Sequence, residues 1–551
     1  MLKKEEVFSY KPNKKYAAAV AYFSMEFAID QSLKIYSGGL GFLAGSHLRS
    51  AYQLKQNLVG IGMLWKYGYY DQVRDMNGNM KVNYTRKYYS FLTDTGIVFP
   101  VEVHNAIVYV KAFLLKPEVF GSAPLFLLST DIAENDPISR TITNRLYDSN
   151  ESTRVAQSIV LGIGGAKLLE ILKMPQDFYH MNEGHALPLA FYLHDKLGSL
   201  SEVRKKLVFT THTPEKAGNE ERDISLLEKM SFFYHLSKAE FCNIWGVEGN
   251  MVNYTLCALR ASKKSNAVSK MHGDVSREMW SGFDDICEIT HITNAQNKLY
   301  WQDDELEAAL DKNNNERLLN RKAQLKKELF DEVADQTGKI FDPHVLTLVW
   351  ARRFAGYKRA NLLTLFKDRF EALLNNKEYP IQIIWAGKPY PEDHGAIEIF
   401  DELFWLTLPY ANATVLTGYE LSLSAKMKKG SDLWLNNPRL TREASGTSGM
   451  TAAMNGSVNF SIPDGWIPEF AQHGKNCFII EPSDVSLSGE EQNNEEATRM
   501  LDMLQNDILP MYYRNKKQWA SIVKEGMKTV APAFDSNRMA DEYYVKMFNP
   551  L

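Results

Sequence analysis

Two series of short apolar runs, separated by one long polar stretch, constrain the fold of this chain most strongly. Runs of the first series end in Gly, Ser, Thr or His, and lie at 20–27, 127–130, 206–213 and 286–294. With helical stretches between them, such runs predict buried parallel strands whose ends carry polar groups. In open α/β sheets, ligands bind beyond those carboxyl ends of the strands.

The polar stretch over 303–339 predicts surface helices that lead into a domain boundary near 330–340. A second series of strand-like runs follows, at 344–353, 381–387, 413–418, 432–436 and 475–480. A final helical stretch is expected over about 496–547. A chain of 551 residues exceeds what one compact core holds. We therefore expect two sequential α/β halves with a cleft between them.

Net charge and cysteine spacing argue against several classes of protein. The formal net charge is −4, so the chain has no general attraction to nucleic acid or to acidic membranes. The four cysteines are scattered, which argues against a disulfide framework or a structural zinc site. The first residues lack the apolar core of a secretory signal, and no apolar run approaches a membrane span. We expect a cytoplasmic protein without nucleic-acid or membrane partners.

Three elements are candidates for binding phosphate. In 36–47, a glycine-rich turn that includes Gly39 precedes an expected helix, and its backbone N–H groups could face an anion. In 351–360, four cations follow a buried-looking strand, and Arg353 and Lys358 could grip a phosphate. The alternatives are a simple strand-to-helix turn for the first element and a basic surface turn for the second.

The third element, 442–456, places small residues before an Ala- and Met-rich helix start. Hydroxyl and N–H groups at this start are offered by Ser445, Gly446, Thr447 and Ser448. Glu443, just upstream, could accept hydrogen bonds from sugar hydroxyls. The alternative is a well-capped core helix. Together, the three elements predict a donor phosphate held between the two halves.

Further polar residues follow strands of the first half, where cleft walls are expected. They are Asn182, Glu183, His185, His212 and Asn294. A single histidine at a strand end is more often structural than catalytic. The sequence has no HExxH motif and no clustered Cys/His spacing, so no metal site is expected.

Taken in order, these segments resemble the α-glucan (glycogen, starch, maltodextrin) phosphorylase family, especially its short bacterial and archaeal branch. The motifs that carry the resemblance are YFSMEF, IYSGGLGFLAGSHL, LLSTDIAEND, HMNEGHA, FTTHTP, VSKMHGDVSREMW, ARRFAGYKRA and DLWLNNPRLTREASGTSGM. They run from about residue 20 to about residue 480. The resemblance implies an α/β protein with the GT-B glycosyltransferase fold, in which two Rossmann-like domains face a central cleft.

The domains expected from this resemblance are 1–335 on the glucan side, 336–520 on the donor-phosphate side, and a helix over 521–551 that crosses back to the first domain. The implied reaction is the reversible transfer of an α-1,4-linked glucosyl unit between glucan and phosphate, giving glucose 1-phosphate with retained configuration. The implied partners are an α-glucan or maltooligosaccharide and phosphate. A homodimer is left open.

The resemblance also assigns roles to single residues. The phosphate would be held by Gly39 N–H, Arg353, Lys358, Gly446 N–H and Thr447, and the glucose hydroxyls by Glu443, Ser445 and Asn294. His212 would lie at the sugar. Arg352 would touch the phosphate of the family cofactor, pyridoxal phosphate (PLP), and Trp301 would lie beside that cofactor. Fixed cations and N–H dipoles around a phosphate leaving group stabilise the charge that develops as its bond breaks.

One position departs from the family signature EASGTxxMK, whose lysine forms an imine with PLP. The sequence here is EASGTSGMT, so Thr451 stands at the lysine position. A hydroxyl cannot form an imine, which excludes covalent PLP at Thr451. A second departure follows Asn294, where the family TNGV is TNAQ.

Three interpretations stay open. PLP could bind without a covalent bond, because the residues expected around its phosphate are kept. The chain could use no PLP and a nucleotide sugar as donor, with Thr451 and Ser448 near the ribose and phosphates. It could also be a non-catalytic glucan-binding or regulatory relative. Sugar transfer ranks first among these, and phosphorolysis ranks slightly ahead of nucleotide-sugar transfer.

Overall fold

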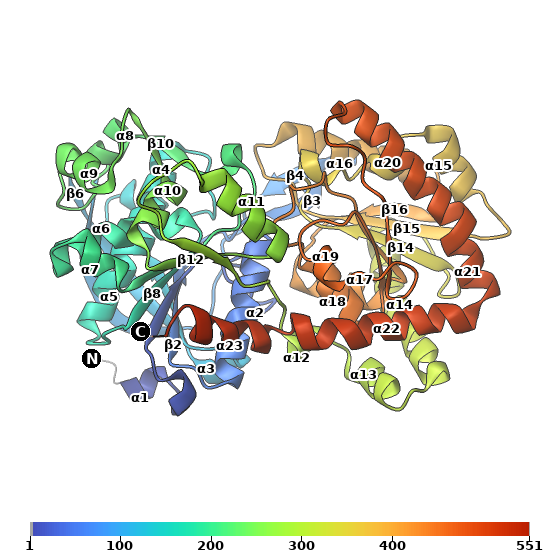
Figure 1. Ribbon diagram of the computed structural model, residues 1–551, viewed down its shortest axis with the longest axis horizontal. Helices are drawn as coiled ribbons and strands as arrows, with labels where there is room; N and C mark the ends of the chain where they lie inside the picture. The colour runs from blue at the N-terminus through green and yellow to red at the C-terminus, as the bar shows by residue number, and fades with distance from the viewer. Residues whose placement is uncertain (1–3, 550–551) are drawn as a thin grey trace. The chain divides into compact units, whose positions relative to one another are not determined.

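The computed structural model describes residues 4–549, which divide into two compact units (Figure 1). The first unit contains residues up to Tyr70, Tyr84–Asn294 and the C-terminal residues from Ser536. The second contains Asp71–Asn83 and Ala295–Asp535. The helices over 304–337, which the sequence places before the domain boundary, thus belong to the second unit, and residues 516–534 and 536–546 fall in different units.

Within the described residues, the first unit is built on a nine-stranded sheet. Its order is β13 (Glu288–His291), β12 (Lys264–Ala267), β9 (Leu207–Thr210), β8 (Phe178–Asn182), β1 (Val20–Phe23), β2 (Leu58–Met63), β7 (Leu125–Ser129), β6 (Ala106–Leu115), β5 (Thr93–Val103). The strands from β13 to β7 run parallel, and β6 and β5 add an antiparallel edge. The strands predicted within 20–27, 127–130, 206–213 and 286–294 are confirmed.

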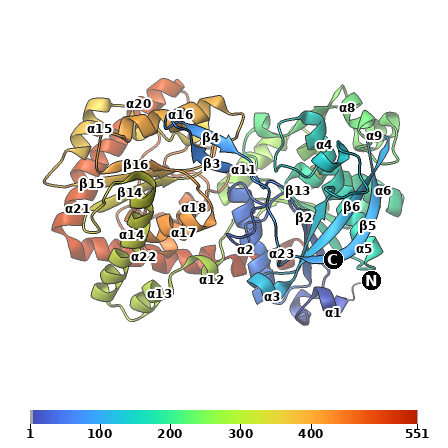
Figure 2. The same cartoon turned by 180° about the vertical axis from the view of Figure 1, so that it is seen from behind.

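Helices pack around this sheet, with a short antiparallel pair β10 (Glu221–Asp223) and β11 (Met251–Asn253) (Figure 2). The helices are α1 (Lys4–Val7), α2 (Gly39–Gln53), α3 (Pro117–Phe120), α4 (Glu151–Ile159), α5 (Gly165–Ile171), α6 (Pro188–Leu197), α7 (Leu200–Arg204), α8 (Ile224–Lys229), α9 (Lys238–Trp245), α10 (Tyr254–Ala261), α11 (Lys270–Trp280) and α23 (Ser536–Lys546). The central strands β1, β2, β7 and β9 are buried along their whole length, as expected for a sheet covered on both faces.

The second unit has an all-parallel sheet with the strand order of a doubly wound fold. The order is β16 (Ala413–Leu416), β15 (Ile381–Ala386), β14 (Leu346–Ala351), β17 (Leu433–Asn436), β18 (Val458–Ser461), β19 (Cys477–Ile479). Counted along the chain, this is the order 3-2-1-4-5-6, so the direction of winding reverses between β14 and β17. The strands predicted in the second series are confirmed, and β18 was not predicted.

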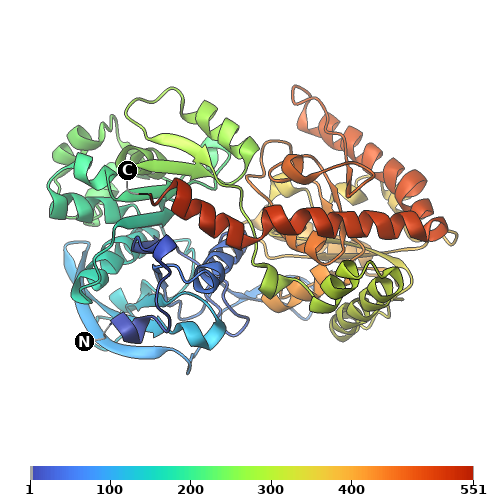
Figure 3. The same ribbon diagram turned by 60° about the horizontal axis from the view of Figure 1, so that its bottom comes forward.

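The remaining elements of this unit cover its sheet. They are the hairpin β3 (Asp71–Arg74) and β4 (Met80–Asn83), with α12 (Lys298–Trp301), α13 (Asp304–Asp311), α14 (Asn315–Thr337), α15 (Lys367–Leu374), α16 (His394–Thr407), α17 (Leu421–Gly430), α18 (Ser448–Met454), α19 (Ile467–Phe470), α20 (Gly489–Met503), α21 (Leu509–Arg514) and α22 (Lys516–Phe534). In Figure 3, the red helix α22 lies along the second unit, where it packs on α18. From Lys4 to Asn549, no helix is both long and apolar enough to cross a membrane.

Candidate functional site

The second unit gathers charged side chains where its winding direction reverses. Arg352 directly follows β14, and the loop that contains Glu443 follows the neighbouring parallel strand β17. The carboxyl ends of parallel strands meet at the same edge, and a ligand binds at such a switch point in open α/β sheets. The structure thus brings together Arg352 and Glu443, which are 91 positions apart in the sequence.

Glu443 forms the centre of this group. Its Oε2 lies 3.1 Å from Lys358 Nζ and 3.4 Å from Arg352 Nη1. Burial raises the pKa of the Glu443 carboxyl, but Lys358 and Arg352 lower it further than burial raises it, so the pKa lies below its ordinary value. Burial lowers the pKa of Lys358 to about 8, against the opposing pull of Glu443. Glu443 is therefore an ionised hydrogen-bond acceptor at neutral pH.

Several buried polar atoms here lack hydrogen-bond partners within the described residues. Within the described residues, Arg352 Nε and Ser445 Oγ make no hydrogen bond, and Arg352 Nη1 and Glu443 Oε2 meet only as an ion pair without hydrogen-bond geometry, although Arg352 and Ser445 are only 6% and 5% exposed. Buried guanidinium N–H groups left without acceptors are costly, so a bound group is expected to satisfy them. Two close cations face one carboxylate, and Arg353 adds an exposed third cation on the same loop. This excess of positive charge suits an anion.

The loop that carries Ser445 is shaped by close backbone approaches. Gly446 has φ +83°, and a Cβ there would lie 3.3 Å from Glu443 Cγ. The Ser445 carbonyl accepts the N–H of Trp466 at 3.0 Å. Thr447 precedes α18 without a side-chain cap, and Ser448 begins that helix of seven residues, its Oγ accepting from Trp434 Nε1 at 3.4 Å.

One of the four basic residues in 351–360 lies outside this site. Arg359 is 4% exposed, donates from Nε to the Asn437 carbonyl at 2.9 Å, and pairs with Glu496. It holds the strand-end loops together and does not face Glu443. Asp464, which the sequence analysis did not single out, does belong here, because its Oδ2 accepts the Glu443 N–H at 2.9 Å. The only sequence signal for it was an Asp-Gly turn just after a strand.

The first unit assembles its own polar group at the carboxyl edge of its sheet. Glu183 Oε1 accepts the His212 N–H at 2.5 Å and the Thr213 hydroxyl at 3.1 Å. The His212 Nε2 lies 2.7 Å from Asn182 Oδ1, and burial lowers the pKa of His212 to about 3, so the ring is neutral. Glu183 has φ +70°, a strained conformation that these hydrogen bonds help to hold.

Other predicted residues of the first unit lie near this group or apart from it. His185 packs 5.6 Å from the Tyr147 ring, and burial lowers its pKa to about 4. Asn294 follows β13, two strands from β9, and its Oδ1 is a buried atom without a partner among the described residues. Gly39 begins α2, and a Cβ there would meet nothing within 4 Å, so the space beside its α-carbon is open.

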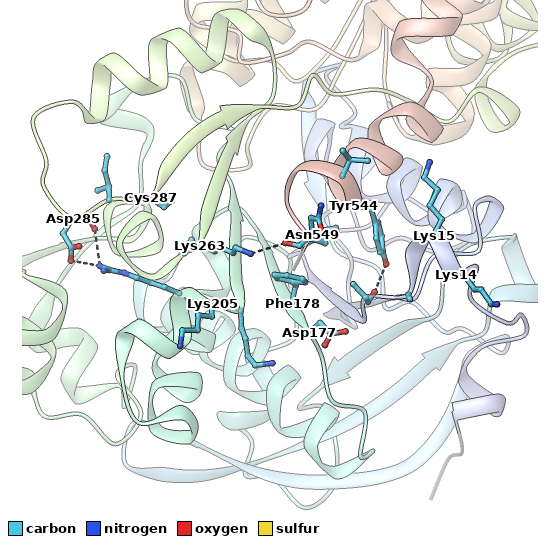
Figure 4. Close-up of a pocket in the computed structure, with 18 residues that line it drawn as sticks. Lys14, Lys15, Asp177, Phe178, Lys205, Lys263, Asp285, Cys287, Tyr544 and Asn549 are labelled. Atoms are coloured by element: carbon cyan, nitrogen blue, oxygen red, sulfur yellow. Dashed lines mark hydrogen bonds and ion pairs between the residues drawn. The ribbon is translucent and has the colours of Figure 1, made fainter. Parts of the chain in front are cut away.

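The first unit also has a cavity of about 1060 Å³ with several cations in its lining (Figure 4). Several of these cations already have partners: Arg204 pairs with Asp285, and Lys263 donates to the Asn549 carbonyl at 3.2 Å. Lys206 and its neighbours precede β9, so the cavity lies at the amino ends of the parallel strands. It therefore lies at the opposite edge of the sheet from Glu183 and His212 and is not part of the candidate site.

Comparison with known proteins identifies the family. A model described as carbohydrate phosphorylase matches residues 289–527. Maltodextrin phosphorylase of Thermococcus litoralis is 33% identical over 97% of this chain and 71% of its own length. This chain belongs to the carbohydrate phosphorylase family.

Two further proteins are similar to this chain. An uncharacterized protein of Methanocaldococcus jannaschii is 48% identical over 96% of this chain and 99% of that protein. Glycogen phosphorylase of Mycobacterium tuberculosis is 30% identical over 96% of this chain and 71% of its own length. The α/β class with large parallel sheets agrees with the GT-B fold of this family, so the predicted fold class is confirmed.

Family members use PLP, and the residues here fit its phosphate better than its ring. Arg352 and Ser445 keep buried atoms that a phosphate could satisfy. Thr451 has no amine, is fully buried, and donates its hydroxyl to the Ser448 carbonyl at 3.0 Å. The Trp301 indole is covered by Lys428, whose Nζ lies 3.8 Å from the ring centroid. Trp301 as a whole is only 1% exposed, so it has no open face for a cofactor ring, and the residues do not fit the ring of PLP.

Proposed function

We propose that this protein is a retaining glycosyltransferase of the α-glucan phosphorylase type, which transfers an α-1,4-linked glucosyl unit between a glucan and phosphate. One observation carries the proposal: buried Arg352, beside Lys358 and Glu443 at the switch point of the second unit, has an Nε–H without an acceptor and an Nη1 that only pairs loosely with Glu443. The family relationship to maltodextrin and glycogen phosphorylases supports the choice of sugar and reaction.

The charges of this group suit the chemistry. As the bond between the anomeric carbon and a phosphate oxygen breaks, negative charge develops on the phosphate. Lys358 and Arg352, held partly out of water, stabilise that charge without needing to reorganise. Glu443 keeps the cations in place and offers Oε2 to a sugar hydroxyl. The reaction needs no pair of carboxylates at glycosidase spacing.

The residues of the first unit are proposed to serve the glucan. The Glu183 hydrogen bonds fix His212 and the backbone around it, as the family resemblance implies for a residue at the sugar. Asn294 Oδ1 is a buried acceptor available for a sugar hydroxyl. Gly39 N–H is proposed to face the phosphate of the substrate.

A nucleotide sugar is the second candidate donor, and the covered face of Trp301 favours it. If no cofactor phosphate is present, a diphosphate leaving group could satisfy the same cations with its two phosphates. Thr451 gives no support for a ribose contact, because its hydroxyl is buried and bonded to Ser448. Ser448 stays a proposed phosphate contact.

A donor screen tests both candidates. The purified full chain is given a maltooligosaccharide acceptor and, in separate reactions, glucose 1-phosphate, UDP-glucose, ADP-glucose or GDP-glucose, and chain extension is measured. Turnover with glucose 1-phosphate supports phosphorolysis, and turnover with a nucleotide sugar alone replaces it with the second candidate. Failure of every donor, with glucan binding retained, would favour a non-catalytic binding role. Arg353→Ala and Glu443→Ala are expected to abolish turnover.

A further inference from the structure

Lys428 is a buried lysine in a helix whose two other lysines are partly exposed. On α17, Lys426 pairs with Glu332 and Lys429 is partly exposed, whereas Lys428 is 1% exposed. Successive helix residues are rotated by about 100°, so neighbouring lysines point to different surroundings. Burying a lysine amine is costly unless it gains specific contacts. The placement of Lys428 therefore needs a reason.

The Lys428 side chain contacts the aromatic ring of Trp301. The amine lies 3.8 Å from the indole centroid, a distance typical of a cation–π contact. Burial lowers the pKa of Lys428 well below its usual range, which reduces the charge that this packing must stabilise. The two helices that carry Lys428 and Thr451, α17 and α18, lie side by side (Figures 1 and 2).

Asn455 joins this pair to Thr451. Its Nδ2 donates to the Trp301 carbonyl at 2.9 Å and to the Thr451 carbonyl at 2.8 Å. Trp301 and Lys428 are each 1% exposed, and Thr451 and Asn455 are fully buried. A space large enough for an aromatic cofactor ring would expose the side chains around it to water. These four residues are therefore closely packed against one another.

We propose that Lys428 occupies the place beside Trp301 that the family gives to the PLP ring, and that this protein works without PLP. The lysine side chain fills the space on the indole face, and Thr451 supplies no amine for an imine. The proposal rests on the family resemblance for the position of the cofactor. It does not depend on which donor the enzyme uses, so the donor screen can fail without affecting it.

The first test uses the unchanged protein. The full chain is produced in cells supplied with pyridoxine and passed through gel filtration, and PLP is measured after acid release. It is then incubated with PLP and borohydride, and modified lysines are located by mass spectrometry. We expect far less than one PLP per chain and no adduct at Lys428, with only trace labelling of exposed lysines. One tightly held PLP per chain, or a borohydride adduct at Lys428, would overturn the proposal.

The second test restores the cofactor site. The double variant Lys428→Ala/Thr451→Lys removes the covering side chain and supplies an amine at the family position, and it is expected to capture one PLP at position 451. The matched control, Lys429→Ala/Thr451→Lys, keeps Lys428 over Trp301 and should capture none. Equal capture by both variants, or no capture by a folded Lys428→Ala/Thr451→Lys, would show that Lys428 is not the excluding group.

If that variant does not fold, Lys428→Ala alone is compared with the unchanged protein by equilibrium dialysis of PLP. Tighter binding supports the proposal and equal binding overturns it.

Discussion

Asp464 Oδ2 accepts the backbone N–H of Glu443 at 2.9 Å, so one buried carboxyl positions another. The same side chain accepts the Gly465 N–H through Oδ1, also at 2.9 Å. Burial raises the pKa of Asp464 to about 7, and the negative charge of Glu443 acts in the same direction against these hydrogen bonds. Near neutral pH, a large share of the Asp464 carboxyl groups is therefore protonated, which limits the negative charge next to Glu443.

The raised pKa of Asp464 predicts a pH-dependent stability. Because the folded-state pKa lies above the unfolded value, the stability contributed by Asp464 is present below about pH 4 and is lost as the pH rises through about 7. Asp464→Asn removes this titration. Between pH 4 and pH 8, the stability of the unchanged protein should fall relative to the variant by up to about 4 kcal/mol. Urea unfolding followed by tryptophan fluorescence measures this, and a pH-independent difference would contradict it.

Lys358 should make anion binding depend on pH. Its pKa of about 8 means that the free site loses this charge in mildly alkaline solution. Sulfate is a suitable probe, since its own charge is constant in this range. We expect calorimetry at low salt to show weaker sulfate binding at pH 9.5 than at pH 6.5, with at least tenfold weaker binding by Lys358→Ala at pH 6.5. Lys367→Ala, which removes an exposed surface lysine, is the control and should bind as the unchanged protein does.

Two glycines of α2 give a matched pair. A Cβ at Gly45 would lie 1.9 Å from the Ala28 carbonyl oxygen, whereas a Cβ at Gly39 would meet nothing within 4 Å. Gly45→Ala should therefore destabilise the protein by about 2–4 kcal/mol, because backbone must move. Gly39→Ala should keep its stability and lower kcat/KM in the donor screen, because the added methyl stands where the substrate phosphate is proposed to approach. Thermal unfolding and initial rates measure the two effects, and full activity of Gly39→Ala would remove Gly39 from the site.

The sequence predicted the strand ends and missed the contacts made by helix faces. Arg352 and Glu443 could be found because an apolar run followed by a charge indicates the end of a buried strand, and strand ends gather at one edge. The burial of Lys428 could not be predicted from the sequence. Three lysines close together in 426–429 suggest a solvated helix end, and only packing decides which of them is buried. Asp464 was missed for a similar reason, since an Asp-Gly turn is common in loops and its bond to Glu443 joins different strand ends.

Asn455 should be among the most sensitive positions in the second unit. Besides its two bonds to carbonyls, its Oδ1 accepts the Asp303 N–H at 2.9 Å. Asn455→Ala removes hydrogen bonds from three buried backbone groups, which should cost roughly 2–5 kcal/mol. Asn412 is the matched control, because its Nδ2 also donates to two carbonyls, at 2.8 and 2.9 Å, but it is partly exposed.

Water can replace the lost bonds of Asn412, so Asn412→Ala should cost about 1 kcal/mol. Urea unfolding of both variants, with the unchanged protein beside them, measures the two costs. Because Asn455 also fixes the Trp301 carbonyl next to the indole under Lys428, its loss should loosen that packing as well as lower stability. Equal losses of unfolding free energy in the two variants would mean that burial of the bonded carbonyls does not determine the loss. That result would also contradict the close packing of Trp301, Lys428 and Thr451.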